Sequence, residues 1–373
     1  MEKKLNIDAV SSAREKLGWT QKELAEKMGV TAQAVTNWMK GKDFPRPDKL
    51  LRLAMLLSLS FTEIVEANSN APVIAFRKRA GTKTTDDHRL KAITMGAMLQ
   101  PLVPYLPKLK ALRTKISSPS LDYRALQNAV KEVRRKLGIG MEAPLQFQNI
   151  ISEFDANDAL IIPSMWGQKT RHENALHILL PSEQVTFIYL NLDTPIEDFK
   201  FWMAHELAHV YTPELAGTDD GEDFADAFAG TLLFPEEVAK TAYSEALKKQ
   251  TQITEMGVLQ RYAQEHQISL YSVFCEVQKY AEDSGLPTLK TKSLQIHKVR
   301  NITRGDLVSE ILFKPLPPEP GALIASAKTV FQSHFFESMK RMLRDKGTGS
   351  GYVQQVLDVS MQDGMAIHAE LIH

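Results

Sequence analysis

The feature that most restricts the fold of this chain is an apolar helical stretch that carries two histidines. Residues 201–210 read Phe-Trp-Met-Ala-His-Glu-Leu-Ala-His-Val. Because a spacing of four residues is just over one helical turn, His205 and His209 project from one face, and both imidazoles can reach one ion. Glu206 lies on an adjacent line of the helix, where it can hold water at that ion. Two histidines on an ordinary helix would give the same pattern, so the surrounding residues decide.

A second helical pattern offers the third protein ligand that a catalytic zinc requires beside an open position for water. It opens at Glu222 and reads E-D-F-A-D-A-F-A-G-T-L-L-F-P. The preceding loop is long enough to turn the chain back, and the small residues of the pattern permit close approach to another helix. We predict Glu222 as the third ligand, with Asp223 and Glu214 as competing candidates. Asp226 lies on the same face, where it can accept a hydrogen bond from a ligating histidine.

Together these two patterns resemble the ImmA/IrrE family of zinc metallopeptidases, whose second motif usually reads E-x-x-A-N-x-F-A-x-x-L-L-x-P. The resemblance covers residues 121–283, and Asp226 stands where the family commonly has Asn. It implies a zincin-like α+β fold, a Zn2+ ion held by His205, His209 and Glu222, and Glu206 as the general base of peptide hydrolysis.

Two details of such a site stay open in the sequence. The group that stabilises the oxyanion is not identified, and His172, His177 and Tyr243 are the candidates. The apolar run Val185 to Leu190, just before the motif helix, is predicted to be a strand that pairs with an extended substrate.

Residues 7–66 form a row of short helical patterns separated by turn signals. Apolar positions from Ile7 recur at helical spacing and stop at Gly18. Thr20 and Glu23 predict a capping box for a helix over 21–28, and Thr31 caps the next helix, over 32–40. The apolar contacts that fix the angle between these two helices are predicted to be Leu24, Ala25, Val30, Val35 and Trp38.

This arrangement, Q-x-x-L-A-x-x-x-G-V from Gln21 and V-x-x-W-x-x-G from Val35, resembles the Cro/C1-type (XRE) helix-turn-helix family. The resemblance implies that the helix from Ala32 enters the major groove of double-stranded DNA, usually as part of a homodimer on a two-fold operator. The alternative is a small bundle used for protein contact. Base edges would be read by Gln33, Thr36 and Asn37, and phosphates held by Gln21, Lys40, Lys42 and Arg46.

The length of 373 residues is too great for one ordinary core, so a multidomain chain is expected. We predict an all-α helix-turn-helix domain (1–68), a basic linker with a docking helix (69–120), the α+β metallopeptidase domain (121–286), and a C-terminal α+β or mostly helical sensor or oligomerisation region (287–373). The linker and the residues after it are rich in basic side chains, namely Arg77, Lys78, Arg79, Lys83, Arg89, Lys108, Lys110, Arg113, Arg134, Arg135 and Lys136.

Composition excludes several classes of protein. A hydrophobic fraction of 43% and a net charge of 0 exclude a disordered or collagen-like chain. Cys275 is the single cysteine, so no internal disulfide can form, which suits a reducing cytoplasm. No apolar run reaches the ~20 residues that span a bilayer, and the N-terminus has no signal-peptide pattern. We therefore expect a cytoplasmic protein without a membrane partner.

The two motif regions favour a DNA-binding transcriptional regulator with a zinc-dependent endopeptidase domain. The family resemblance implies that it cuts a helix-turn-helix repressor, or itself, in response to stress. One alternative is a transcription factor whose metal domain senses a ligand or partner without proteolysis, and another is an antitoxin-like regulator. The intact Glu206 favours hydrolysis, because a sensor could lose this residue without losing the metal.

Overall fold

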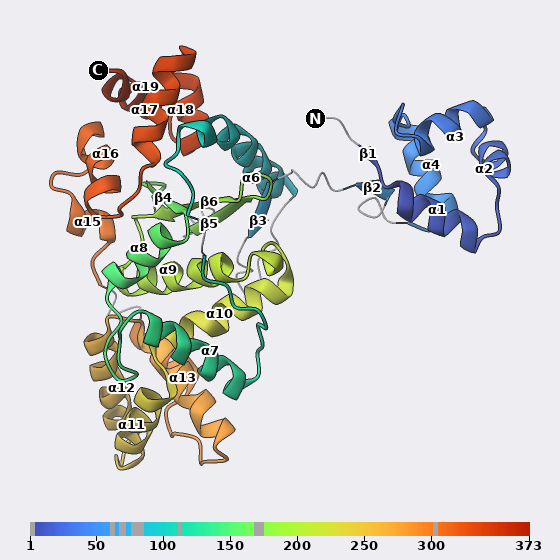
Figure 1. Ribbon diagram of the computed structural model, residues 1–373. Coiled ribbons are helices and arrows are strands. Elements are labelled where there is room, and N and C mark those ends of the chain that lie inside the picture. The colour runs from blue at the N-terminus through green and yellow to red at the C-terminus, as the bar shows by residue number, and fades with distance from the viewer. Residues whose placement is uncertain are drawn as a thin grey trace. The chain divides into compact units, whose positions relative to one another are not determined.

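The computed structural model describes residues 4–59, 64–66, 72–75, 86–110, 113–167, 175–300 and 305–373. The chain forms two compact units, Met1–Ala71 and Pro72–His373 (Figure 1). The division lies close to the boundary expected at residue 68, and residues 287–373 belong to the same unit as the H-E-x-x-H helix. Arg77, Lys78, Arg79 and Lys83 of the predicted basic linker lie outside the described residues, as does His172.

The first unit is a helical bundle whose ends are joined by a short antiparallel pair of strands. Thr20 and Glu23 form the predicted capping box, and Gly29 takes the left-handed conformation at the turn between the second and third helices. Leu24, Val35 and Trp38 are buried in its core, as their spacing predicted. The elements are β1 (Lys4–Leu5), α1 (Ile7–Lys16), α2 (Gln21–Met28), α3 (Ala32–Met39), α4 (Pro47–Leu57) and β2 (Val65–Glu66).

The second unit contains a mixed sheet in the order β3-β5-β6-β4. Its strands are β3 (Val73–Ala75), β4 (Ala159–Ser164), β5 (Ala175–Leu180) and β6 (Val185–Asn191). β5 is antiparallel to both neighbours, and β4 is parallel to β6. β6 contains the apolar run that was predicted to be a strand, whereas β3 was not predicted. The predicted pairing of a substrate with β6 is wrong, because β5 and β4 already occupy both edges of that strand.

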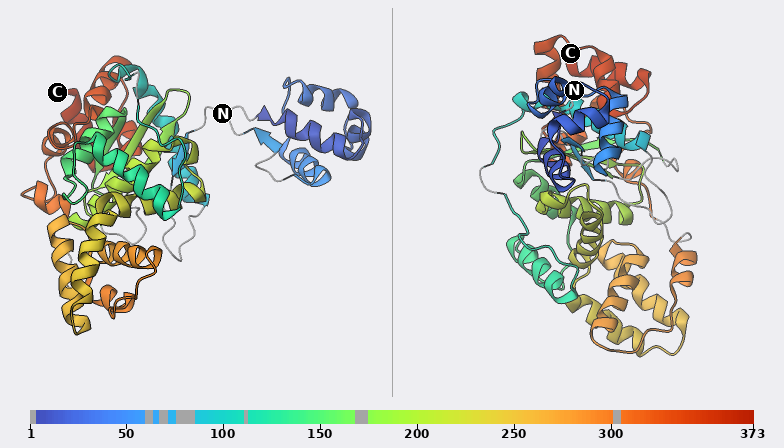
Figure 2. Two further views of the ribbon diagram at one scale, coloured as in Figure 1. Left: turned by 60° about the horizontal axis from the view of Figure 1, so that its bottom comes forward. Right: turned by 90° about the vertical axis from the view of Figure 1, so that its right-hand side faces the viewer.

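Side chains alternate between the two faces of this sheet, and each face has its own core. Ile161 and Ile188 lie in the core that also contains α9, whereas Ile74, Ile178 and Phe187 lie in the opposite core (Figures 1 and 2). Helices of the first core include α7 (Tyr123–Lys136), α8 (Phe147–Ala156), α9 (Ile196–Tyr211), α10 (Asp219–Leu233), α11 (Glu236–Leu247), α12 (Gln252–His266) and α13 (Leu270–Asp283).

The C-terminal helices cover the face of the sheet that is turned away from α9. Phe335, Met339 and Val356 are buried there beside Ile178, and Tyr189 donates its hydroxyl to the carbonyl of Val356 at 2.8 Å. The predicted docking helix packs in this core too. The remaining elements are α6 (Asp86–Leu99), η1 (Gln100–Tyr105), η2 (Pro213–Leu215), α14 (Ser293–Arg300), α15 (Val308–Leu312), α16 (Pro320–Thr329), α17 (Phe335–Lys346), α18 (Ser350–Leu357) and α19 (Met361–Ile372).

Three of the described basic residues, two in the linker and one at the end of α7, are paired with acids of the second unit. Lys110 contacts Asp155 at 2.9 Å, Arg113 contacts Asp158 at 3.2 Å, and Lys136 contacts Glu153 at 2.7 Å. These pairs favour a connector that packs on its own unit over a surface that holds phosphates. Within the described ranges, no helix has both the length and the apolar character needed to cross a membrane.

Candidate metal centre

The H-E-x-x-H sequence lies in the C-terminal half of α9, a helix buried on almost all sides. Met203, Ala204, Leu207 and Ala208 are fully buried, which is the pattern of a helix inside a core rather than on a surface. His205, Glu206 and His209 are only 1%, 4% and 1% exposed. Three ionisable side chains are therefore held inside a protein core, where each needs a polar partner.

A sharp reversal of the chain after α9 brings the start of α10 back against it. Thr218 caps α10 by accepting a hydrogen bond from the amide of Gly221 at 3.0 Å. A Cβ atom at Gly221 would lie only 2.1 Å from the carbonyl oxygen of Leu215, so glycine is required for this approach. The next residue, Glu222, is thereby directed at the two histidines.

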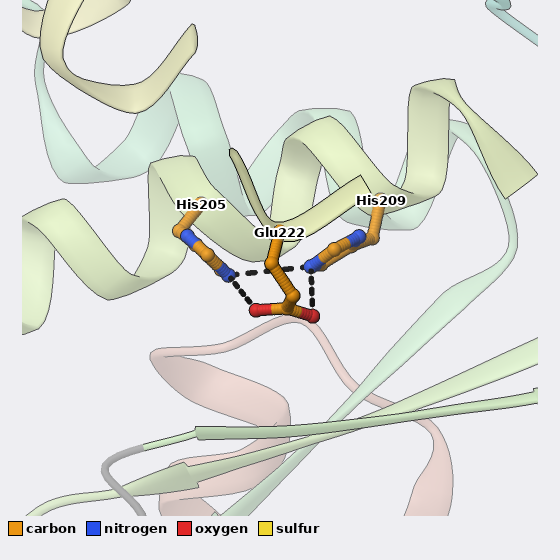
Figure 3. A group of neighbouring side chains, drawn as sticks. All are labelled: His205, His209 and Glu222. Carbon is orange, nitrogen blue, oxygen red and sulfur yellow. Dashed lines mark hydrogen bonds and ion pairs between the residues drawn. The ribbon is translucent and has the colours of Figure 1, made fainter. Parts of the chain in front are cut away.

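The side chains of His205, His209 and Glu222 converge on one point, as Figure 3 shows. The two Nε2 atoms are 3.2 Å apart, and the carboxylate oxygens of Glu222 lie 3.5 Å from Nε2 of His205 and 3.3 Å from Nε2 of His209. In a tetrahedral zinc site with bonds of about 2.0–2.1 Å, neighbouring ligand atoms are roughly 3.3 Å apart. The three side chains therefore have the spacing that such a site requires.

Asp226, one turn after Glu222 on α10, orients the first histidine. Its Oδ1 lies 2.9 Å from Nδ1 of His205, so this nitrogen donates the hydrogen bond and Nε2 faces the centre. Burial acts against a charge on His205, but the contacts with Asp226 and Glu222 outweigh it and raise its pKa to about 9. The side chain of Asp226 is 40% exposed, so solvent moderates this attraction.

The donor set suits a cation. Burial acts to raise the pKa of Glu222, yet the two imidazoles outweigh it and lower that pKa to about 2. Neither oxygen of Glu222 nor Nδ1 of His209 has a well-formed hydrogen bond among the described residues. Two imidazoles and one carboxylate are a ligand set of catalytic zinc sites, and these residues therefore fit Zn2+. Glu214 and Asp223, the competing candidates, are exposed and lie outside the group.

His177 on β5 completes the polar surroundings of Glu206. Its Nδ1 is 3.4 Å from Oε2 of Glu206, and its ring centroid is 5.4 Å from that of His209. Burial lowers the pKa of His177, which favours the neutral ring. Of the two oxyanion candidates that the structure describes, His177 contacts the proposed base. Tyr243 instead donates its hydroxyl to the carbonyl of Pro287 at 2.7 Å.

The predicted DNA-reading side chains gather on α3 and at the start of α2. Nε2 of Gln33 donates to Oδ1 of Asn37 at 3.0 Å, and the hydroxyl of Thr36 lies 3.4 Å from Oε1 of Gln21. Thr36 also donates to the carbonyl of Ala32 at 2.9 Å. These contacts hold the polar side chains of α3 in a defined arrangement. Among the predicted phosphate contacts, Lys40, Lys42 and Arg46 are exposed and Gln21 is partly buried.

Comparison with known proteins identifies the first unit. Residues 10–64 match the family model described as helix-turn-helix, a range that includes α2 and α3 and the residues of the XRE-type pattern. Comparison with curated proteins and with solved structures gives no match. The match supports double-stranded DNA as a partner. The chain is therefore a multidomain protein with an N-terminal helix-turn-helix domain, as a DNA-binding regulator requires.

Proposed function

We propose that this protein is a DNA-binding transcriptional regulator whose second unit is a zinc-dependent endopeptidase with a zincin-like arrangement of ligands. The observation that carries the proposal is the convergence of His205, His209 and Glu222 beside Glu206. The proposed substrate is a protein, either a helix-turn-helix repressor or the chain itself. The helix-turn-helix domain would bind its operator as a homodimer.

The roles of the side chains follow from their positions. His205, His209 and Glu222 would hold the Zn2+ ion, which when bound would activate water and polarise the carbonyl of the scissile peptide. Glu206 follows His205 directly on α9 and is not one of the converging ligands, and its role in this proposal is to accept a proton from the attacking water and pass it to the leaving amine. Asp226 keeps Nε2 of His205 directed at the ion.

His177 acts as a positioning residue for Glu206 in this proposal. A small movement from the 3.4 Å separation would let its Nδ1–H donate to Oε2 and fix the carboxylate in the core. The exposed fraction of His177 is 1%, so little water competes for this contact. A base held in one orientation transfers protons more efficiently than a mobile one.

The test compares Glu206→Gln with Glu214→Gln, a matched loss of an exposed acid from the loop after α9. Wild type, Glu206→Gln and Glu214→Gln should each bind about one zinc ion per chain, because their metal ligands are intact. His205→Ala should lose the zinc ion. Each form is then incubated with a co-purified helix-turn-helix repressor, and intact chains are counted by mass spectrometry.

We expect wild type and Glu214→Gln to lose intact repressor or intact chain, and Glu206→Gln to preserve both. Full zinc occupancy without any cleavage that depends on Glu206 would contradict the peptidase. That result would favour a regulator whose metal domain senses a ligand or partner.

A further inference from the structure

The first segment of the second unit forms the edge strand of the sheet. β3 pairs antiparallel with β5, so that Val73 lies opposite Leu179, Ile74 opposite Ile178, and Ala75 opposite His177. This strand follows the helix-turn-helix unit directly in the chain. A segment next to the DNA-binding unit thus pairs with the strand that carries His177.

β3 lies next to the strand whose His177 contacts the proposed base. Residues directly opposite each other in an antiparallel pair direct their side chains to the same face, so Ala75 shares the face of His177. The imidazole of His177 reaches Glu206 from that face at 3.4 Å. Neighbouring strands are about 4.8 Å apart, so the backbone of β3 is one strand away from the residue that contacts the proposed base.

The rest of the unit holds β3 in place from both sides. Pro72 packs closely against α6, where a Cβ atom at Gly96 would lie 2.5 Å from Cβ of Pro72. Gly217, in the loop between α9 and α10, approaches the carbonyl oxygen of Ile74, which a Cβ atom there would meet at 2.8 Å. Ile74 and Ala75 are 8% and 3% exposed. The segment is therefore packed into the unit.

Extended peptides are commonly recognised by adding a strand to the edge of a sheet, with backbone hydrogen bonds for affinity and alternate side chains for specificity. β5 carries His177, which contacts Glu206, and β3 occupies the edge of β5 that is not paired with β6. We propose that this edge of β5 is the substrate-binding position and that β3 is a built-in competitor for it. This inference rests on the proposed peptidase function and assigns its substrate class.

The positions of the β3 residues opposite β5 indicate which residue types a peptide needs in order to replace β3. The residue opposite His177 would be small, as Ala75 is, because Ala75 is buried on the face of the sheet that also carries the His177 side chain. The preceding residue would be apolar, because Ile74 packs in the core on the other face with Ile178. The substrate is thus an extended segment with an apolar residue before a small one, and it enters only after β3 has left. Release of β3 would connect catalysis to the unit that binds DNA.

A reversible disulfide between the two strands tests the assignment in the full-length chain. Val73→Cys and Leu179→Cys place cysteines at opposite positions, where Cα atoms of antiparallel strands are about 4.5–5.5 Å apart, within disulfide range. The pair is made in a Glu206→Gln background that keeps the ligands. The probe is a fluorescein-labelled peptide with the sequence of residues 70–77, Asn-Ala-Pro-Val-Ile-Ala-Phe-Arg.

We expect the reduced protein to bind the peptide about tenfold or more tightly than the oxidised protein, because the disulfide keeps β3 on the edge of β5, whereas in the reduced protein β3 can leave and the peptide can take its place. Each single-cysteine variant should bind equally in both redox states, which controls for Cys275. Equal affinity of the locked and unlocked protein would overturn the inference, and so would absence of peptide binding to the unlocked form.

A second variant loosens β3 without a cysteine. Gly96→Ala adds a methyl group against Pro72, whereas Gly257→Ala adds one to another helix at a position with no atom within 4 Å. With Glu206 intact, Gly96→Ala should cleave unfolded casein severalfold faster than wild type, and Gly257→Ala should match wild type. If both glycine variants cleave casein at the same rate and the cleavage depends on Glu206, the role of β3 is wrong and the peptidase proposal stands. If no variant cleaves casein in a manner that depends on Glu206, but the disulfide still controls peptide binding, the peptidase proposal is wrong and the assignment of the β5 edge stands.

Discussion

Replacement of Asp226 by alanine should weaken zinc binding without removing a ligand. The carboxylate lies 2.9 Å from Nδ1 of His205 and fixes the ring so that Nε2 faces the centre. Loss of such an orienting partner typically lowers metal affinity about 10- to 100-fold, which corresponds to about 1.4–2.7 kcal/mol of binding free energy. Because the side chain is 40% exposed, we expect a loss near the lower end of this range.

The assay is a competition titration with a chromophoric zinc chelator at neutral pH, together with circular dichroism to verify that the variants fold. Asp226→Asn keeps an oxygen acceptor and loses the charge, so its affinity should fall between those of wild type and Asp226→Ala. Asp223→Ala, which removes an exposed acid from the same helix, should bind zinc like wild type. Unchanged zinc affinity in Asp226→Ala would contradict the role of Asp226 in orienting His205. An equal loss in Asp223→Ala would show that net charge, and not ring orientation, is responsible.

Three further predictions concern other parts of the chain. Burial, with a smaller effect of Arg134, lowers the pKa of Lys200 from 10.5 to about 8, so the unfolded chain binds more protons between these pH values. The free energy of unfolding should therefore rise through this window by about 3 kcal/mol, and Lys200→Met should abolish that rise in urea titrations at each pH. Thr20→Ala removes the capping box of α2 and should cost about 1 kcal/mol, measured as faster hydrogen exchange of the α2 amides; unchanged exchange would contradict the cap's contribution. In operator titrations, Gln33→Ala should cost about 1–3 kcal/mol and relax specificity, whereas Lys42→Ala should weaken all sequences alike and reduce the salt slope by about one. Loss of specificity in Lys42→Ala would reverse these two roles.

Local patterns in the sequence were sufficient where short-range interactions determine the structure. The capping box of Thr20 and Glu23 lies within one helical turn, and the structure forms it as predicted. The spacing of His205 and His209 fixes their common face in the same way. Glu222 could be chosen over Glu214 because it starts a helical pattern with small residues, which allows the close helix packing that the structure shows.

Long-range pairing was not accessible to the same reasoning. β3 has only three residues, and its partner in β5 lies about one hundred residues further along the chain, so no local periodicity reveals it. The run at 185–190 was recognised as a strand, but alternation of side chains does not tell which neighbours a strand has. For that reason β6 was mistaken for an edge strand. The contact between His177 and Glu206 could not be predicted for the same reason, because it depends on which face of the sheet α9 packs against.

X-ray absorption at the zinc edge, recorded on the purified 373-residue chain, would identify the atoms that bind the metal. We predict about one zinc ion per chain, bound through two imidazole nitrogens and carboxylate oxygen at about 2.0–2.2 Å without a sulfur ligand. Glu222→Ala should lose or sharply weaken this signal, whereas Glu214→Ala should retain it. A protein that binds no zinc after reconstitution, or whose zinc spectrum does not change in Glu222→Ala, would contradict the assignment of His205, His209 and Glu222 as the metal centre.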